Sequence, residues 1–528
     1  MKRMIAVVVV LVLALGEISL GDPGQRSGLL EKSEDAWPGY TLMAPIALTT
    51  TYLLDMDGTV VHTWESDAPA GNAVYLLDNG NLLRTEQVLP EGERRFDQGG
   101  AGGRVREIAP DGTVVWEYTL SDTQRRLHHD VAALPNGNIL MIAWEAVSRA
   151  EAIAAGRDPL LLKDDELWAD IVIEVRPEPP SGGEIVWIWR VWDHLVQDFD
   201  PTKEYFGDVA AEPGLVDLNY AHQGGGKDWN HTNSIAYNAQ LDQIALSVHE
   251  FGEVWIIDHS TTTCEAAQHS GGRSGRGGDL LYRWGNPRAH RAGDLSDQVW
   301  FGQHDVHWIE AGLPGAGHLL AFNNGLGRPE RTRPYSTVDE VAVPVLTDGS
   351  YAQPETGVPY VPAEPAWQYR GPGLYSANIS GAQRLSNGNT LICEGGSGRI
   401  LEVTATGARA WEYVNPFGKP GKNGPRNEVF KVRRYAFDSP QIAQLFSSLE
   451  ESSRPTVDRE PYGCRPVPLR RAQDRGTLWE RTRGLSRNRR LTPSALPIRT
   501  AGLHHPFGPG EGSPRTIAKR YRGGGTCS

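Results

Sequence analysis

Cysteine, basic charge and long apolar runs are all scarce in this chain. Its 528 residues include only four cysteines, spaced so widely that they form neither a disulfide framework nor a metal knuckle. We expect mostly unpaired thiols at Cys264, Cys393, Cys464 and Cys527. The formal net charge of -13 argues against nucleic acid as a partner, because phosphate binding needs a basic face.

The main apolar run covers residues 5–15, behind two basic residues. It is too short to span a bilayer, which takes roughly 20 apolar residues. This pattern is typical of a secretory signal peptide, which we expect over residues 1–16, followed by a linker over 17–36. An uncleaved N-terminal anchor is the alternative. We therefore expect a periplasmic or secreted protein whose mature chain is not inserted in a membrane.

Helical periodicity is almost absent, and strands ending in pairs of rings take its place. Six pairs with one intervening residue occur: His62 and Trp64, Trp116 and Tyr118, Trp187 and Trp189, Tyr282 and Trp284, Trp367 and Tyr369, and Trp411 and Tyr413. Alternate residues of a strand share one face, so both rings can pack between neighbouring sheets. Six copies predict an all-β, six-bladed β-propeller over residues 37–438. A pair of β-sandwiches is the alternative, although sandwiches need no axial repeat.

Five polar residues recur where a strand of each repeat begins: Asn72, His129, His231, His304 and Ser380. Equivalent side chains of a radial repeat point at a common axis, so we expect these five to face one another in a central funnel. Five positions leave one blade of the six without such a residue. We expect residues 39–47 to complete the blade of Trp411 and close the ring.

Four long insertions separate the repeats, over residues 150–169, 193–229, 260–279 and 328–366. Such loops gather on one rim of a propeller, where they would wall the mouth of the funnel and favour a small-molecule site. The composition then changes, and residues 439–528 are predicted to form a disordered tail rich in Arg, Pro and Gly. A polybasic interaction arm is the alternative.

Three histidines on one axis, His129, His231 and His304, indicate chemistry in addition to packing. An imidazole can be a nucleophile, an anion ligand or a metal ligand. Metal-bound histidines usually donate their second nitrogen to a carboxylate. The only carboxylates close in sequence, Asp130 and Asp305, directly follow a histidine and so face the opposite side of the strand. We therefore predict no metal and no other cofactor.

Three runs then occur in order: Trp229–Tyr237 (WNHTNSIAY), Phe301–Trp308 (FGQHDVHW) and Phe322–Arg328 (FNNGLGR). Together they resemble the bacterial aryl-sulfate sulfotransferases, and the resemblance covers most of residues 37–437. It implies an exported six-bladed propeller that moves a sulfuryl group from a phenolic sulfate donor to a phenolic acceptor. The transfer would pass through a transient sulfohistidine, without a nucleotide cofactor.

The resemblance also implies roles for single residues. It makes His304 the nucleophile and gives sulfate binding to His129, His231 and Asn233. Ser380 stands where the family has a hydroxyl residue. One of the two histidines His129 and His231 would return the proton to the departing phenolate.

The sequence departs from the family in two places. The family arginine that grips the sulfuryl group is replaced by Val248 or His249, so we expect a protonated His249 or Arg328 to bind the anion instead. We do not expect the N-terminal sandwich with which relatives dimerise, and the oligomeric state is not predicted. Two other functions fit the same histidines: a metal-dependent oxygenase or hydrolase, and a non-catalytic ligand-binding propeller.

Overall fold

The computed structural model describes residues 27–89, 95–220, 226–329, 333–421 and 424–452. The chain divides into two units, 1–454 and 455–528, and all described residues lie in the first. The expected signal peptide and residues 453–528 of the expected tail lie outside this description. Within it, no helix has both the length and the apolar character needed to cross a membrane.

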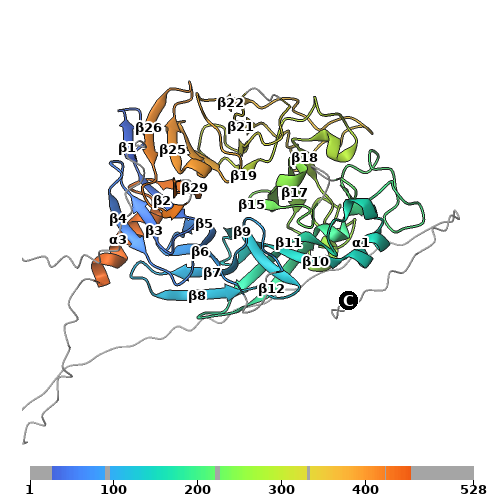
Figure 1. The fold of residues 1–528 in the computed structure, drawn as a ribbon, viewed down its shortest axis with the longest axis horizontal. Helices are drawn as coiled ribbons and strands as arrows, with labels where there is room; N and C mark the ends of the chain where they lie inside the picture. The colour runs from blue at the N-terminus through green and yellow to red at the C-terminus, as the bar shows by residue number, and fades with distance from the viewer. Residues whose placement is uncertain (1–26, 90–94, 221–225, 330–332, 422–423, 453–528) are drawn as a thin grey trace, which may run out of the picture. The chain divides into compact units, whose positions relative to one another are not determined.

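Six antiparallel sheets surround a central axis, which confirms the predicted all-β six-bladed propeller (Figure 1). Strands β5, β9, β15, β19 and β29 lie around the centre of the ring. From the axis outwards, the first three blades consist of β29 (Val429–Tyr435), β2 (Tyr40–Pro45), β3 (Thr51–Leu54) and β4 (Val60–Trp64); β5 (Ala70–Leu76), β6 (Leu82–Gln87), β7 (Gly103–Ile108) and β8 (Val114–Thr119); and β9 (Arg125–Ala133), β10 (Ile139–Ser148), β11 (Glu166–Pro177) and β12 (Gly183–Arg190).

The other three blades follow in chain order. They consist of β15 (Thr232–Asn238), β16 (Gln243–Val248), β17 (Glu253–Asp258) and β18 (Tyr282–Trp284); β19 (His304–Trp308), β20 (Leu319–Asn323), β21 (Thr337–Val341) and β22 (Trp367–Tyr369); and β23 (Gly381–Arg384), β24 (Thr390–Glu394), β25 (Arg399–Val403) and β26 (Arg409–Val414). Short elements connect them: α1 (Arg149–Ala155), α2 (Thr263–Ala266), and the strand pairs β13 (Leu195–Val196) with β14 (Val216–Asp217) and β27 (Lys419–Gly421) with β28 (Gly424–Arg426).

The six ring pairs occupy the fourth strand of each blade, counted from the axis. Several of their tryptophans join neighbouring blades through indole N–H groups. Trp116 of blade 2 donates to the carbonyl of Gly182 in blade 3 at 2.7 Å. Trp411 of blade 6 donates to the carbonyl of Met56 in blade 1 at 3.0 Å. At these two gaps, an apolar ring with one polar N–H group closes the space between neighbouring blades.

Ring closure differs from the expectation. Residues 39–47 do close the ring, but in the blade of Trp64, where β2 pairs with β29 in a register that places Tyr40 opposite Tyr435. The blade of Trp411 is complete without them, and β1 (Gly28–Lys32) of the expected linker adds a fifth strand to its outer edge. Strand β29 supplies the sixth axial position, at Phe430, which carried no turn motif to mark it.

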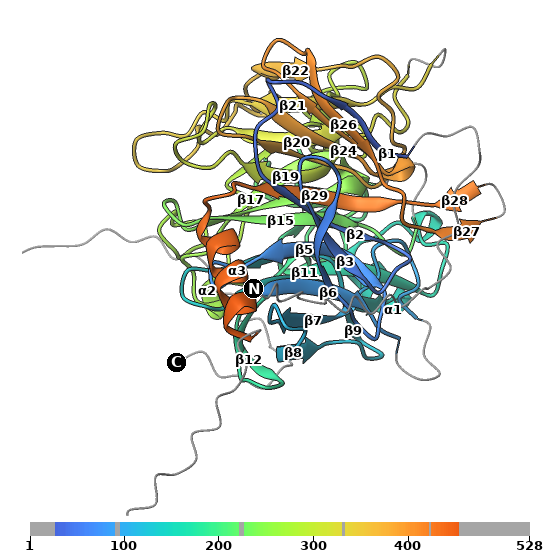
Figure 2. The ribbon, with the colours of Figure 1, turned by 90° about the vertical axis from the view of Figure 1, so that its left-hand side faces the viewer.

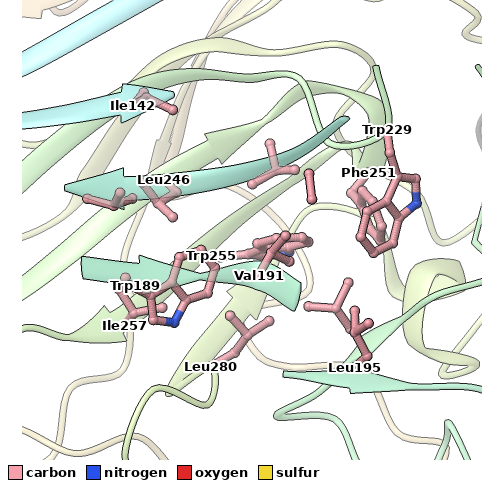
Figure 3. Close-up of a cluster of buried hydrophobic side chains, with 14 of the residues drawn as sticks. Ile142, Trp189, Val191, Leu195, Trp229, Leu246, Phe251, Trp255, Ile257 and Leu280 are labelled. Carbon is pink, nitrogen blue, oxygen red and sulfur yellow. The ribbon is translucent and has the colours of Figure 1, made fainter. Parts of the chain in front are cut away.

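The two blades that carry His129 and His231 share a large apolar cluster (Figure 3). Trp189 and Val191 from the end of blade 3 meet Leu246, Trp255 and Leu280 from blade 4. All five side chains are buried. Because interiors pack densely, this cluster fixes the two blades relative to each other and hence the spacing of the axial histidines.

The propeller body extends beyond the expected boundary at residue 438. Helix α3 (Pro440–Ser452) buries Ile442 and Leu445 in a cluster with Leu53 and Leu76 of the first two blades (Figure 2). The amide of Leu445 comes so close to Gly80 that a Cβ there would lie 2.5 Å from it. Residues 440–452 therefore belong to the folded unit and not to a disordered tail.

A second polar cluster on the axis, the axial ion network, joins the inner strands. Lys431 of β29 lies 2.7 Å from Asp130 and 3.2 Å from Asp305. Arg433 also binds Asp305 at 2.7 Å, and the Tyr75 hydroxyl donates to Asp130 at 2.8 Å. The two remaining inner strands, β15 and β23, contribute backbone N–H groups. Ile235 of β15 donates to Asp130, and Ala382 of β23 donates to Asp305.

Two cysteines lie in the described residues. Cys264 of α2 is disulfide-bonded, so the expectation of an unpaired thiol is wrong at this position. Cys393 of β24 is free and buried, as expected. Cys464 and Cys527 lie outside the described residues.

Candidate active site

Four histidines line one cavity of about 680 Å³ near the axis. The ring of His231 lies between those of His129 and His249, with centroids 4.6 and 5.2 Å away. His249 in turn lies 5.4 Å from His304. Phe430 packs against His129 and His304 at 5.9 and 6.0 Å. The structure thus brings together the three axial histidines and the candidate His249.

His304 is held in a single tautomer. Its Nδ1 lies 3.2 Å from the carbonyl of Gly302 and 2.8 Å from Oδ1 of Asn324. A carbonyl oxygen only accepts hydrogen bonds, so Nδ1 carries the proton. Burial and the neighbouring His249 lower the pKa of His304 to about 3. His304 is therefore neutral at physiological pH, and its Nε2 keeps a lone pair.

His231 is in the opposite state. Its Nδ1 donates to Oδ2 of Asp228 at 2.6 Å, and Oδ1 of the same carboxylate accepts from the indole of Trp144 at 2.9 Å. Burial alone disfavours the charged imidazole, but Asp228 outweighs it and raises the pKa of His231 to about 9. His231 is therefore an imidazolium at neutral pH, and the same cavity holds the neutral His304 and the charged His231.

His129 is neutral and tightly enclosed. Burial, followed by the charge of His231, holds the pKa of His129 well below 6.5. Its Nδ1 lies 2.8 Å from Nδ1 of His128, and a Cβ on Gly100 would lie only 1.9 Å from its ring. Arg126 binds the carbonyls of Phe96 and Gly102 and so fixes the loop that carries Gly100.

His249 occupies the place where the resemblance expects an arginine. Its ring lines the cavity, and its Nδ1 lies 2.9 Å from Oε1 of Glu250. Val248 is fully buried in β16 and does not reach the cavity. Lys227 also lies in the wall, 3.4 Å from Asp97 and over the ring of Trp168 at 4.4 Å. Sequence reasoning missed this lysine, because it lies in an insertion outside the repeat.

Four other candidates lie outside the cavity wall. Asn233 is buried and donates to the carbonyl of Gln303, the residue before His304. The Ser380 hydroxyl donates to Oδ1 of Asn324 at 3.2 Å and so supports the partner of His304. Arg328 stacks on Tyr335 at 4.2 Å. These three do not line the cavity, and neither does Asn72.

The insertions only partly wall the mouth. Asp164 from the first insertion and residues 226–228 from the second line the cavity. The described parts of the third and fourth do not. The third, residues 260–279, packs at the outer end of β12, where Trp189 donates to the carbonyl of Gly278 at 2.7 Å. An insertion of a propeller can lie at either end of a blade or at its outer edge, and the sequence does not indicate which of these places it occupies.

Contrary to the expectation from the sequence, the cavity histidines do not lack carboxylate partners. Carboxylates do contact the second nitrogen of two cavity histidines, Asp228 at His231 and Glu250 at His249. The two carboxylates considered from the sequence, Asp130 and Asp305, bind Lys431 of the axial ion network instead. Among the described residues, the one group of His, Cys, Asp and Glu spaced closely enough for a shared metal ion lies elsewhere, at His194, His269 and Asp279.

The arrangement combines three chemical capacities in one cavity. His304 presents an unprotonated nitrogen, which is a nucleophile. His231 presents an acid that also attracts anions. No described protein group forms a hydrogen bond with Nε2 of His304, so this atom is available to a ligand.

Comparisons with known proteins indicate one family. A family model described as "Arylsulfotransferase (ASST)" matches residues 38–414. Arylsulfate sulfotransferase AssT from Escherichia coli O6:H1 (strain CFT073) is 23% identical over 412 residues, which are 72% of this chain and 63% of that protein. AssT from Lelliottia amnigena is 23% identical over 413 residues, with the same two shares. The chain thus spans 63% of the length of these curated relatives.

Solved structures resemble the chain only distantly. A protein of unknown function from Bacteroides caccae matches with a TM-score of 0.41 and 11% sequence identity. The match covers 75% of this chain and 98% of that one.

Proposed function

The chain belongs to the arylsulfotransferase family, and from this premise we propose that it transfers a sulfuryl group from a phenolic sulfate ester to a phenol. The observation that carries the proposal is the pair of His304 and His231 in opposite protonation states within one cavity. One supplies the nucleophile, and the other supplies the proton that the leaving phenolate needs.

In the first half of the reaction, Nε2 of His304 attacks the donor sulfur. The bond from sulfur to the phenolic oxygen breaks, and its electron pair leaves with the phenolate. The phenolate takes a proton from the imidazolium of His231, whose pKa of about 9 lies close to that of a phenol, about 10. Proton transfer between groups of similar pKa is nearly balanced, which favours catalysis in both directions.

In the second half, the now neutral His231 takes the proton of the acceptor phenol. The resulting phenolate attacks sulfur, and the electron pair of the nitrogen–sulfur bond returns to Nε2 of His304. While the sulfuryl group is attached, the imidazole ring is positively charged. The Gly302 carbonyl and Asn324, which contact Nδ1, then stabilise that charge, because hydrogen bonds to a charged donor are stronger.

The sulfuryl oxygens need fixed positive partners during transfer, much as a transferred phosphoryl group does. Charged His231 and Lys227 are the cations of the cavity wall. His249 lies between His231 and His304 and takes the place of the family arginine. We place the reaction in the periplasm or outside the cell, which is consistent with a donor that is not a nucleotide.

The experiment that tests this function has two parts. A chromogenic aryl sulfate is mixed with the protein and a phenol, and release of the donor phenol is followed. Parallel lines in a double-reciprocal plot, together with one sulfuryl group on the peptide containing His304 after incubation with donor alone, are the expected results. His304→Asn should lose nearly all turnover and the adduct while it keeps the melting temperature of the parent protein. An adduct on another residue, or intersecting lines, would contradict the proposed nucleophile.

A further inference from the structure

A cluster of two histidines and one aspartate lies outside the cavity, where blades 3 and 4 meet. His194 follows the single 3₁₀ turn Val191–Asp193 at the end of β12. His269 and Asp279 lie in the long connection between β17 and β18 of blade 4. One ligand atom from each of the three lies within 4.8 Å of the others. None of the three lines the cavity, so the cluster is separate from the proposed active site.

The ring of His194 is fixed on every side. It stacks on the indole of Trp189, with centroids 5.7 Å apart and an interplanar angle of 5°. Its Nε2 lies 2.8 Å from the carbonyl of Ala266. Gly278 lies so close that a Cβ there would be 2.5 Å from this nitrogen. Figure 3 shows Trp189 and the neighbouring Leu195 and Leu280 along one edge of the apolar cluster that supports the site.

This fixed ring presents its Nδ1 to a carboxylate. A carbonyl oxygen only accepts, so Nε2 of His194 donates to Ala266, and Nδ1 is the ring atom that faces the cluster. That Nδ1 lies 2.8 Å from Oδ1 of Asp279, and Nδ1 of His269 lies 2.7 Å from the same oxygen. Two imidazole nitrogens and one carboxylate oxygen thus converge within 4.8 Å of one another.

We propose that His194, His269 and Asp279 bind a divalent metal ion of the zinc class, with water as a fourth ligand. Two imidazole nitrogens and one carboxylate are a donor set that zinc accepts in a tetrahedral site. Bond lengths of about 2.0 Å place such ligands about 3.3 Å apart, so a small outward movement opens the cluster to the ion. The Nε2 hydrogen bond from His194 to Ala266 orients the imidazole, as outer partners of metal-bound histidines do.

The exposure of the three side chains gives the ion a way in. His194 is fully buried and Asp279 is 12% exposed, whereas the side chain of His269 is 52% exposed. An ion can therefore enter from the solvent beside His269 and keep a water molecule on that side. Since His194 belongs to blade 3 and the other two ligands to blade 4, the metal joins two blades at their outer edge. It does not take part in the reaction at the axis.

The test uses the full-length protein, freed of metal by dialysis against a chelator. Titration with Zn²⁺ alone should show one saturable site, and Zn²⁺ should raise the melting temperature. Co²⁺ should give the visible absorption of a tetrahedral site with nitrogen and oxygen ligands. His269→Ala changes a half-exposed side chain, which the fold tolerates, and it should abolish the Co²⁺ spectrum and the thermal shift.

The matched control is His318→Ala, at another partly exposed histidine whose Nδ1 lies 2.7 Å from a single carboxylate, that of Glu340. This variant should bind both metals as the parent protein does. If the parent protein shows no saturable binding, the proposal is wrong. Equal binding by His269→Ala would also overturn it and would place the metal elsewhere, as at the cavity histidines.

Discussion

The side-chain oxygen of Asn324 lies 2.8 Å from Nδ1 of His304. The amide nitrogen of Asn324 donates to the carbonyl of Ser376 at 2.8 Å, which fixes the amide so that its oxygen faces the imidazole. A neutral acceptor at this place orients the ring without giving it a negative partner. His304 consequently keeps a free Nε2, and its pKa stays low because burial outweighs the hydrogen bond to Asn324, which raises it.

Replacing this amide by a carboxylate should shift the pH at which kcat/KM falls on acidification to a higher value. In Asn324→Asp, a negative charge next to Nδ1 raises the pKa of His304 from about 3, so kcat/KM should fall as the solution becomes acidic, at a higher pH than in the parent protein. Asn324→Leu should lose the tautomer and at least about a hundredfold in turnover. Ser380→Ala removes only a supporting hydrogen bond and serves as the milder control. Unchanged pH profiles in Asn324→Asp would show that Asn324 does not set the state of His304.

The decrease in kcat/KM at alkaline pH should reflect the loss of the proton from His231. Its pKa in the folded protein, about 9, exceeds its ordinary value of 6.5, so it is charged and active as an acid at neutral pH and loses its proton as the pH rises through about 9. We expect kcat/KM for the donor to fall across that range. Asp228→Asn removes the carboxylate that contacts the ring, leaves burial opposed only by the more distant charges of Glu250 and Asp170, and should shift the fall to lower pH. Asp164→Asn changes another carboxylate of the cavity wall and should leave the decrease at the same pH.

The same pair affects stability in a known direction. A histidine whose pKa is raised by folding stabilises the folded state fully below pH 6.5, and this contribution is lost as the pH rises through about 9. The melting temperature should therefore fall over this range by more in the parent protein than in His231→Asn. Equal slopes would contradict the assigned ion pair with Asp228.

The family has an arginine where this chain has Val248 or His249. An arginine should be compatible with the fold at position 249 but not at position 248. His249 faces the cavity, so His249→Arg places a permanent planar cation beside the substrate and should lower KM for aryl sulfates. Val248 is fully buried, so Val248→Arg buries an unpaired charge and should destabilise the fold by several kcal/mol. Kinetic and melting measurements on both variants check this. A stable and more active Val248→Arg would show that the family position has been misplaced.

The C-terminal boundary can be tested by truncation. A chain ending after Asp438 lacks α3 and exposes apolar surface on the first two blades, so its melting temperature should fall. Leu445→Ala in the full chain should cost about 2–5 kcal/mol of unfolding free energy, because the side chain is fully buried. A chain ending after Arg454 keeps α3 and should melt at a higher temperature than the chain ending after Asp438. Equal melting of the 438 and 454 truncations would contradict the assigned role of α3.

Chelation should separate the two groups of histidines. A charged His231 cannot offer a lone pair to a metal and repels one at the axis, so dialysis against a chelator should leave turnover unchanged at a temperature well below melting. The same treatment should lower the melting temperature if the outer cluster holds an ion. Turnover that is lost on chelation and restored by one metal would favour a metal-dependent propeller enzyme instead.

The sequence predicted the blades because their signal is local. Trp116 and Tyr118 alternate on one strand, and this spacing alone indicates a face packed against a neighbour. It did not predict β29 or the place of α3, since Phe430 and Leu445 carry no turn or repeat motif. Partners such as Asp228 were also missed. This residue reaches His231 from an insertion whose path depends on the rest of the fold.

The sequence predicted which strand Asn233 belongs to more reliably than the direction in which its side chain points. The resemblance implied that Asn233 binds the anion, and alternation would place it on the same strand face as His231. The backbone of His231 has a positive φ of 52°, which breaks that alternation, and a bulge separates Thr232 from Ser234 in the pairing of β15 with β16. Asn233 consequently supports the neighbouring blade instead of lining the cavity.

The axial ion network sets an order in which the ring can be completed during synthesis. Asp130 and Asp305 leave the ribosome early, but Lys431 and Arg433, which neutralise them, lie in the last strand of the propeller. Until that strand arrives, closing the centre would bury two carboxylates without their cations, at a cost of several kcal/mol for each. We therefore expect chains that end before β29 to stay open at the axis. The centre of the ring becomes stable only when Lys431 and Arg433 are present, so only a chain that includes β29 can close the propeller.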